Sequence, residues 1–243
     1  MIHRTGSFGA ATYAVTDRSG GASGPPFDAL NLGDHVGDDP GAVAANRRLL
    51  AESLGLGPDR MVYMSQVHGR DVAVLDGPPA AGAPVAVADG MVTRVPGLAL
   101  VVLTADCVPV LLADGSGVVG VAHAGRKGVH AGVVGAVVDA MRRLGADPSD
   151  VSAVVAPAVC GRCYEVPAEM RDAVSARVPA AGSTTRAGTP ALDLPAAVAA
   201  QLDDAGVRSV QRLTECTAET PSLYSHRRDA VTGRFAGVVW TAA

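Results

Sequence analysis

Two residues that can bind a metal or act in nucleophilic catalysis, Cys107 and His123, lie in the most apolar part of the chain, residues 98–128. The first half of this stretch is an almost unbroken aliphatic run, which predicts a strand buried on both faces. Asp106 and Cys107 interrupt the run, although buried polar groups are costly without partners. A second apolar run reaches His123 after a Gly-rich turn typical of a β-hairpin. Paired strands would bring the thiol and the imidazole together, so this stretch predicts a chemical site.

A third candidate, His68, follows a short predicted strand, and we expect it to come from a second hairpin. His68, Cys107 and His123 would supply the imidazole nitrogens and the thiolate of a catalytic zinc site, with a fourth position left for water or substrate. The same residues could instead form a cysteine nucleophile with one histidine as its base. In a third interpretation they are packing residues. Their spacing leaves these alternatives open.

A basic segment containing Arg126 and Lys127 follows His123 at the predicted start of a helix. Backbone N–H groups and cations at such a position are suited to phosphate or carboxylate. The spacing is not that of a P-loop, and a solvated basic turn is the competing interpretation. Further cations that could reach the same anion, or could be surface charges, are Arg47, Arg227 and Arg228.

The remaining cysteines show no pattern that assigns them chemistry. Cys160-Gly-Arg-Cys163 has no second Cys pair and does not begin a thioredoxin-like unit. Zinc nucleobase deaminases combine His-x-Glu with Pro-Cys-x-x-Cys, whereas Val159 stands here in place of the proline and neither candidate histidine is followed by that glutamate. We therefore disfavour the deaminase fold, though not deamination, and expect structural roles for Cys160 and Cys216.

Composition limits the class of protein. The chain has 243 residues, enough to bury a sizeable core, and we expect one domain over residues 1–243. Aromatic residues make up 3% and the net charge is −4, so the stacking platform and basic stripe of nucleic-acid-binding proteins are missing. Without a signal peptide, a membrane-spanning run or a disulfide framework, we expect a cytoplasmic monomer or weak dimer with neither nucleic-acid nor membrane partners.

The elements that must position the candidate residues do not follow a regular βαβ rhythm. An edge strand is expected near Tyr13, and a helix from Pro40 to Gly55 is expected to expose Asn46 and Arg47. Further strands are predicted near residues 61–67, 72–75, 151–155, 208–213 and 235–240, further helices over 128–144, 167–178 and 195–205, and a loop over 78–87. Hairpins are indicated as often as crossovers, so we predict an α+β fold with mixed sheets.

Eight sequence motifs in register resemble those of the YfiH-like family, also called the laccase-domain or multicopper polyphenol oxidase family, whose members look like purine nucleoside phosphorylases. The resemblance covers nearly the whole chain. The motifs are Asn31-Leu-Gly-x-His35-Val-Gly-Asp38, Ser65-Gln-Val-His68-Gly, Ala88-Asp89-Gly90, Thr104-Ala-Asp-Cys107-Val-Pro, Val121-Ala-His123-Ala-Gly, Cys163-Tyr-Glu-Val, Leu192-Asp-Leu, and Tyr224-Ser-His-Arg-Arg-Asp229 with Thr232-Gly-Arg234. Where the family usually continues with Trp-Arg-Gly, this chain has Arg126-Lys127-Gly128.

The resemblance implies a four-layer αββα sandwich and a zinc ion, with copper possible, held by His68, Cys107 and His123. It further implies phosphorolysis of adenosine, inosine and methylthioadenosine to the free base and ribose 1-phosphate, together with adenosine deamination. Alternatives are peptidoglycan-precursor editing by hydrolysis, copper polyphenol oxidation, or a non-catalytic zinc-stabilised interaction protein.

Roles follow for further residues. We expect Asp89 or Asp106 to orient a ligand imidazole or move protons. The residues expected to bind the purine nucleoside or phosphate are Asn31, Arg47, Gln66, Lys127 and Arg228.

Overall fold

Two β-sheets form the centre of the computed structural model, which describes residues 1–80, 83 and 85–243. Residues 81, 82 and 84 of the predicted 78–87 loop lie outside this description. The five-stranded sheet has the order β1 (Ile2–Phe8), β2 (Ala11–Thr16), β13 (Phe235–Thr241), β6 (Ala99–Thr104) and β3 (Met61–Val62). The six-stranded sheet has the order β12 (Ser209–Arg212), β9 (Ser152–Val155), β7 (Val108–Ala113), β8 (Val119–Ala124), β5 (Gly90–Thr93) and β4 (Val72–Leu75).

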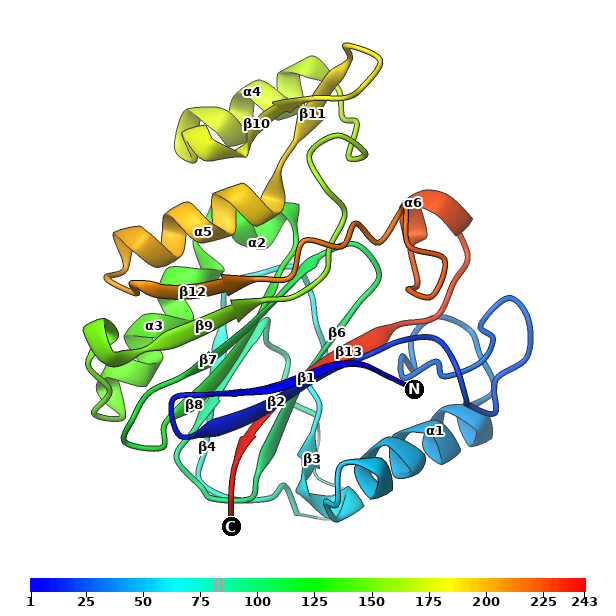
Figure 1. Ribbon diagram of the computed structural model, residues 1–243, viewed down its shortest axis with the longest axis vertical. Helices are drawn as coiled ribbons and strands as arrows, with labels where there is room; N and C mark the ends of the chain where they lie inside the picture. Colours follow the sequence, from blue (N-terminus) through cyan, green and yellow to red (C-terminus); the bar gives the residue numbers. More distant parts are fainter. Residues whose placement is uncertain (81–82, 84) are drawn as a thin grey trace.

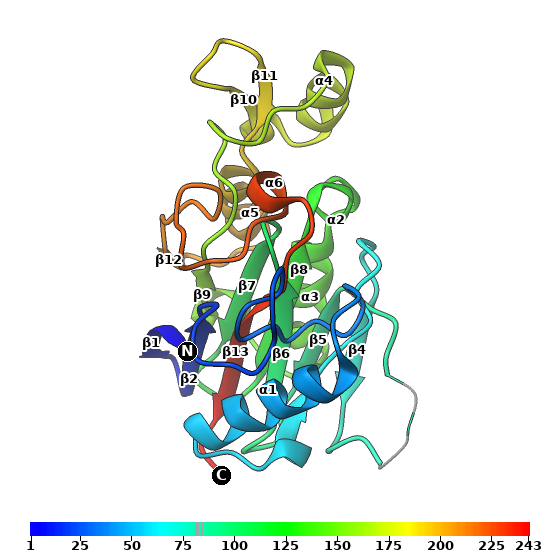
Figure 2. The ribbon, with the colours of Figure 1, turned by 90° about the vertical axis from the view of Figure 1, so that its right-hand side faces the viewer.

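Helices cover the outer faces of both sheets (Figures 1 and 2). Helix α1 (Pro40–Ser53) packs on the five-stranded sheet, and α3 (Val133–Arg143) and α5 (Leu194–Asp204) pack on the other. Helix α4 (Ala168–Arg177) and the hairpin of β10 (Gly182–Thr184) and β11 (Pro190–Leu192) lie beyond α5. The remaining described elements are two short α-helices, α2 (Arg126–Ala131) and α6 (His226–Asp229), and three 3-10 helices, Pro58–Arg60, Pro148–Asp150 and Pro179–Ala181.

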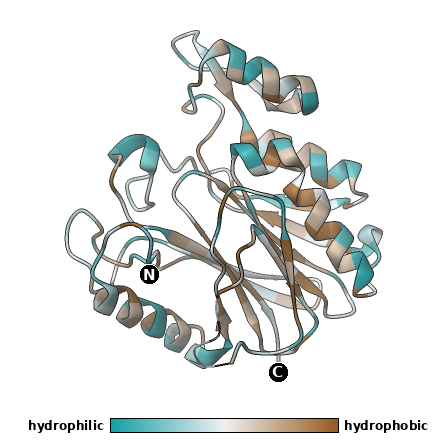
Figure 3. Ribbon diagram, turned by 180° about the vertical axis from the view of Figure 1, so that it is seen from behind, coloured by the Kyte–Doolittle hydropathy of each residue, from teal (hydrophilic) through white to brown (hydrophobic). Residues whose placement is uncertain are grey.

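Separate apolar clusters fill the spaces between the layers. One lies between α1 and the five-stranded sheet, a second between the two sheets, and a third between the six-stranded sheet and its helices. Figure 3 shows the apolar residues concentrated in the interior strands, with polar residues on the outer surfaces of the helices. The α+β class and the αββα layering are therefore confirmed.

Strands β6 and β7 explain why residues 98–113 read as one apolar run. On β6, Leu100 faces the opposite sheet while Val101 faces α1. On β7, Leu111 faces the opposite sheet while Leu112 faces the helices. Both strands are buried on both faces, as predicted, but the prediction of a single interrupted strand is wrong, because they belong to different sheets.

Other local predictions have mixed outcomes. The hairpin leading to His123 is confirmed as β7 and β8. The strand predicted near Tyr13 is β2, but the prediction that it lies at an edge is wrong, because it pairs with β1 on one side and β13 on the other. His68 does not lie in a hairpin, because β3 and β4 belong to different sheets. The helix predicted over 128–144 is divided at Gly132, whose φ is 85°. No helix among the described residues is long and apolar enough to cross a membrane.

Asn46 is fully buried, which corrects the prediction that α1 exposes it. Its Oδ1 accepts a hydrogen bond from the backbone N–H of Ala22 at 2.7 Å, and its Nδ2 donates to the carbonyl oxygen of Asn31 at 2.8 Å and to Ser23 Oγ at 2.9 Å. Arg47 is half-buried, with its guanidinium over the ring of Tyr63. Asn46 thus joins α1 to the loop that precedes it.

Replacing Asn46 by alanine should remove the hydrogen bonds to the backbone N–H of Ala22 and to the carbonyl oxygen of Asn31, because alanine has no polar side-chain atom. We expect Asn46→Ala to lower the free energy of unfolding by about 2–3 kcal/mol. Urea denaturation followed by circular dichroism measures this change. The exposed neighbour Arg48 supplies the control, because Arg48→Ala should change the free energy of unfolding by less than about 0.5 kcal/mol. Equal effects of the two substitutions would contradict the role given to Asn46.

Candidate functional site

His68, Cys107 and His123 come together at one end of the two sheets. His123 lies on β8 and pairs with Pro109 of β7, Cys107 immediately precedes β7, and His68 comes from the loop between β3 and β4. One side-chain ligand atom of each lies within 4.8 Å of the others. Cys107 Sγ is 3.8 Å from His68 Nε2, and the two imidazole rings meet edge-on with centroids 4.8 Å apart. The structure therefore brings together the three residues of the predicted metal site.

The Asp89 carboxylate forms hydrogen bonds with both histidines. This fully buried carboxylate lies 2.8 Å from His123 Nδ1. It also accepts hydrogen bonds from the backbone N–H groups of Val67, His68 and Gly69, at 3.2, 2.9 and 2.6 Å. A carboxylate on Nδ1 places the donor hydrogen there and directs Nε2 toward Cys107 as a free ligand atom, an arrangement typical of metal-binding histidines. The His68 backbone has φ of 61°, and these hydrogen bonds stabilise that left-handed conformation.

Asp106 organises a different set of groups. Its Oδ1 accepts hydrogen bonds from Thr217 Oγ1 at 2.6 Å and from Ser225 Oγ at 2.7 Å, and its Oδ2 accepts one from the backbone N–H of Arg227 at 2.6 Å. Its φ is 103°, an uncommon conformation for a residue other than glycine. These hydrogen bonds connect the loops that contain Thr217, Ser225 and Arg227 to the segment between β6 and β7, next to Cys107.

Cys107 and His123 shift each other's proton affinity. Burial alone would raise the pKa of the Cys107 thiol, but the cationic His123 imidazole and hydrogen bonds with His123 and His68 lower that pKa to about 6. Burial alone would lower the pKa of His123, but the Cys107 thiolate and the Asp89 carboxylate raise it to about 9. Without a metal, the pair is a thiolate and an imidazolium at neutral pH.

The three residues open onto a cavity of about 670 Å³. Of the other predicted site residues, Gln66, Asp106 and Lys127 line it. Gln66 makes paired hydrogen bonds of 2.8 Å with the backbone N–H and carbonyl of Leu103, which fixes the end of β6 beside the cavity. The cationic side chains on the cavity wall are Arg126, Lys127, Arg227 and Arg234.

Asn31, Arg47 and Arg228 do not line this cavity. Asn31 is fully buried, and its Oδ1 accepts from the backbone N–H groups of Gly33 and Arg234. The Arg47 guanidinium donates to the carbonyl oxygen of Leu32. The guanidinium of Arg228 donates to backbone carbonyls of the loop before α6, those of Thr217, Thr220 and Leu223. All three polar side chains are committed to holding loops.

Several cavity residues were absent from the predicted set. Tyr164 contributes an aromatic wall, with the Arg227 guanidinium 5.0 Å from its ring centroid. Burial and the neighbouring Arg234 guanidinium lower the pKa of His35, so this cavity residue is neutral near pH 7. His226 lines the same space. The available signal was their position inside the eight motifs, because each residue alone resembles a surface group.

The donor set fits a metal ion. Zn²⁺ binds thiolate sulfur at about 2.3 Å and imidazole nitrogen at about 2.1 Å, so two such ligands of a tetrahedral ion lie about 3.6 Å apart. The separation of 3.8 Å between Cys107 Sγ and His68 Nε2 is close to this value. Gly125 keeps the space open, since a Cβ there would lie 2.7 Å from His68 Cδ2 and 2.9 Å from Cys107 Sγ.

A side chain at position 125 should therefore displace the ligands. We expect Gly125→Ala to lower the metal content of purified protein by about one equivalent per chain, because the added methyl group collides with both His68 and Cys107. Elemental analysis after gel filtration measures it. Gly135→Ala is the matched control, since a Cβ there meets nothing within 4 Å, and it should stabilise α3 by about 0.5–1 kcal/mol with metal content unchanged. A fully metallated Gly125→Ala protein would contradict this geometry.

The lowered pKa of Cys107 has a measurable consequence for the metal-free protein. Because the thiolate is the reactive form, alkylation of Cys107 by iodoacetamide after chelation should have its midpoint near pH 6. Peptide mass spectrometry quantifies the modified residue as a function of pH. In His123→Gln the imidazolium is gone, so the midpoint should move upward to the pH of an ordinary thiol or above. A midpoint unaffected by this substitution would refute the ion pair.

Comparison with known proteins agrees with this architecture. Residues 12–242 match the family model described as multi-copper polyphenol oxidoreductase laccase. A purine nucleoside phosphorylase of Streptomyces coelicolor is 56% identical over 241 residues, covering 99% of each chain. Another of Mycobacterium tuberculosis is 54% identical over 227 residues, covering 93% of this chain and 90% of the relative.

Solved structures share the fold. YlmD from Geobacillus stearothermophilus matches with a TM-score of 0.88 at 35% identity, covering 97% of this chain and 93% of that one. The hypothetical protein YfiH from Bacillus licheniformis matches with a TM-score of 0.87 at 33% identity, covering 95% and 92%. With the sequence matched from residue 12 to residue 242 and the fold shared along nearly its whole length, this chain belongs to the multi-copper polyphenol oxidoreductase laccase family.

Proposed function

We propose that this protein is a zinc-dependent purine nucleoside phosphorylase that converts adenosine, inosine or methylthioadenosine and phosphate to the free base and a ribose 1-phosphate. The observation that carries the proposal is a His/Cys/His metal-ligand set opening onto a cavity lined by four cationic side chains. The names of relatives up to 56% identical support the choice of reaction.

The cavity has the size and lining that this reaction requires. Its volume of about 670 Å³ falls within the range of about 300–1,000 Å³ of small-molecule sites. Apolar walls from Leu103, Val159 and Leu194, with the ring of Tyr164, can contact a purine. Lys127 and Arg126 begin α2 beside His123 and can bind phosphate through charge-assisted hydrogen bonds.

The chain's own residues supply positioning and charge. A phosphate oxygen forms a bond to C1′ of the ribose as the bond from C1′ to N9 of the purine breaks, and the electron pair leaves with the base. The cationic wall would hold the phosphate in line for this attack and offset its charge. A zinc ion bound by His68, Cys107 and His123 would supply Lewis-acid activation. Asp89, through its hydrogen bond to His123 Nδ1, keeps that ligand in one orientation.

Adenosine deamination is the second activity that we propose for the same cavity. In that reaction water adds at C6 of the purine and ammonia leaves. The exposed side of the ligand set, where His68 meets solvent, gives water access. An open cavity beside the ligands also disfavours a purely structural metal, because structural zinc sites are closed by protein ligands.

Incubation with adenosine, with and without phosphate, tests the proposal. Adenine formed only when phosphate is present supports phosphorolysis, and inosine formed without phosphate supports deamination. His68→Ala should abolish both activities and the metal held by His68, Cys107 and His123. Absence of turnover by metal-loaded wild-type protein would overturn the proposal. Oxidation of a phenol by copper-loaded protein, or hydrolysis of a peptidoglycan precursor, would replace it with one of the rival activities.

The phosphate contact can be tested separately. Loss of a charge-assisted contact costs about 1.5–3 kcal/mol, so Lys127→Ala should raise the KM for phosphate about tenfold or more with a smaller change in the KM for nucleoside. Arg143→Ala is the charge-matched control, because Arg143 is exposed at the end of α3 and should leave both constants unchanged. A Lys127→Ala enzyme with wild-type phosphate dependence would exclude this residue from the anion site.

A further inference from the structure

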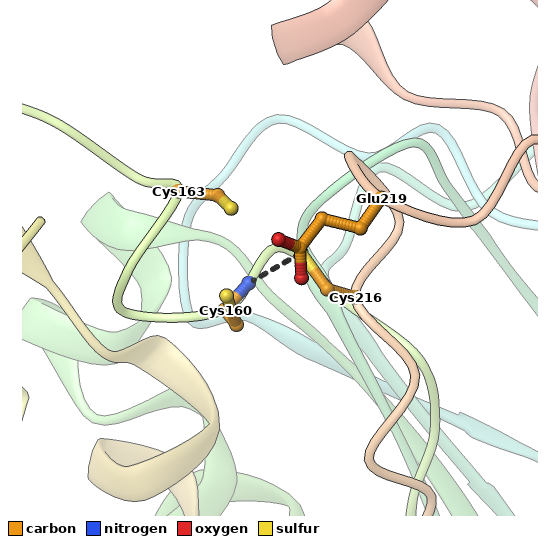
Figure 4. A group of neighbouring side chains, drawn as sticks. All are labelled: Cys160, Cys163, Cys216 and Glu219. Carbon is orange, nitrogen blue, oxygen red and sulfur yellow. Dashed lines mark hydrogen bonds between the residues drawn. The ribbon is translucent and has the colours of Figure 1, made fainter. Parts of the chain in front are cut away.

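A second group of metal-ligand residues lies outside the cavity. It consists of Cys160, Cys163, Cys216 and Glu219, and one side-chain ligand atom of each lies within 4.8 Å of the others. None of the four lines the cavity described above. Figure 4 shows the Glu219 carboxylate pointing toward the cysteines. The sequence analysis expected no such group, because the second half of the cluster contains a single cysteine.

Two tight turns with the same spacing build the cluster. In the first, the backbone N–H of Cys163 donates to the carbonyl oxygen of Cys160 at 2.9 Å. In the second, the N–H of Glu219 donates to the carbonyl oxygen of Cys216 at 3.0 Å. A parallel bridge between Ala158 and Cys216 holds the turns side by side. The result is Cys-x-x-Cys facing Cys-x-x-Glu, which is the paired-turn spacing common in structural zinc sites.

The packing of the first turn requires glycine between the cysteines. A Cβ at Gly161 would lie 2.7 Å from both Asp193 Cβ and Ser183 Oγ. Ser183 Oγ in turn donates to the carbonyl oxygen of Gly161 at 3.1 Å. The turn is therefore fixed against the β10–β11 hairpin and the start of α5, so its two cysteines are held in place before any ligand binds.

The surroundings hold the sulfur atoms and a neighbouring cation in fixed positions. The backbone N–H of Cys160 donates to Cys216 Sγ at 3.3 Å, which keeps this sulfur beside the first turn. Three thiolates and a carboxylate around a divalent ion leave a net charge of −2. Arg186 offsets part of it, since its guanidinium lies 3.7 Å from Cys163 Sγ and forms an ion pair with Glu219. All three cysteines are free thiols in the structure.

We propose that Cys160, Cys163, Cys216 and Glu219 form a second, structural metal site that binds Zn²⁺. Thiolate-rich tetrahedral sites select Zn²⁺ among the common divalent ions. Four protein ligands would close the coordination sphere, which distinguishes this site from the open His68, Cys107 and His123 set.

The site would join two walls of the cavity. Tyr164, which lines the cavity, directly follows Cys163, and Thr217, which hydrogen-bonds to Asp106, directly follows Cys216. Arg186, from the loop of the β10–β11 hairpin, contacts Cys163. A bound ion would therefore hold the hairpin and both wall segments in one arrangement.

Metal counting on a simplified protein tests this site alone. In the double variant Cys107→Ser/His68→Ala the first ligand set is removed, and the only remaining thiols are the three of the cluster. We expect this protein to retain one zinc per chain after gel filtration, and its cobalt form to show intense thiolate-to-cobalt charge-transfer absorption. Adding Cys163→Ser should remove the zinc and weaken the absorption. Retention of no zinc by the folded double variant would overturn the proposal.

The wild-type chain provides a second measurement that does not depend on the folding of the double variant. Cys163→Ser alone should lower the zinc content by one equivalent relative to wild type, and Glu219→Gln should weaken zinc retention against a chelator at least tenfold. Glu169→Gln, on the exposed face of α4, is the control and should match wild type. A disulfide is the competing chemistry, and finding one free thiol in place of three in the metal-free, unreduced double variant would refute the proposed site.

Discussion

The site depends on one buried carboxylate. Asp89 is fully buried, and burying an unpaired charge would cost several kcal/mol. Burial would raise its pKa, but the hydrogen bonds from His123 and from the Gly69 and His68 backbone amides lower it. The same hydrogen bonds fix the ring of His123 and the backbone of His68, so satisfying the charge of Asp89 also positions two of the three candidate ligands. Moving either histidine would therefore remove a hydrogen bond from a buried charge.

The third candidate ligand, Cys107, is positioned where the chain passes from one sheet to the other. β6 and β7 are buried on both faces in different sheets, so the residues between them must turn at the end of both layers. Asp106 adopts φ of 103° at this turn and is stabilised by hydrogen bonds from three separate residues. Backbone strain of this kind persists where surrounding structure fixes it. The sheet crossing therefore exposes Cys107 to the cavity while its neighbours remain in the core.

The features that were predicted correctly are those that local sequence patterns determine. The hairpin to His123 and helix α1 follow from periodicity and caps, and the grouping of His68, Cys107 and His123 follows from the resemblance to the YfiH-like family. The sheet to which each strand belongs could not be predicted in this way, because a strand buried on both faces shows no alternation of polar and apolar residues that would distinguish one sheet from the other. The burial of Asn46 depends on a loop whose nearest hydrogen-bonding residue is 15 positions away, and the commitment of Arg228 to backbone carbonyls depends on how the loop before α6 folds back on it. For the same reason the cluster around Cys216 was missed, because its halves are 56 residues apart.

The cavity wall is built partly from loops whose polar groups form hydrogen bonds with one another. Asp106 accepts hydrogen bonds from Thr217, Ser225 and Arg227, and the Arg228 guanidinium donates to carbonyl oxygens of the same loop. These contacts place Arg227 on the cavity wall, where Arg126, Lys127 and Arg234 also lie. The carboxylate and carbonyl oxygens are turned inward to hold the loops, and the guanidinium of Arg227 is left to face the cavity. The hydrogen bonds that hold the wall loops thus also support the anion binding that we propose for this cavity.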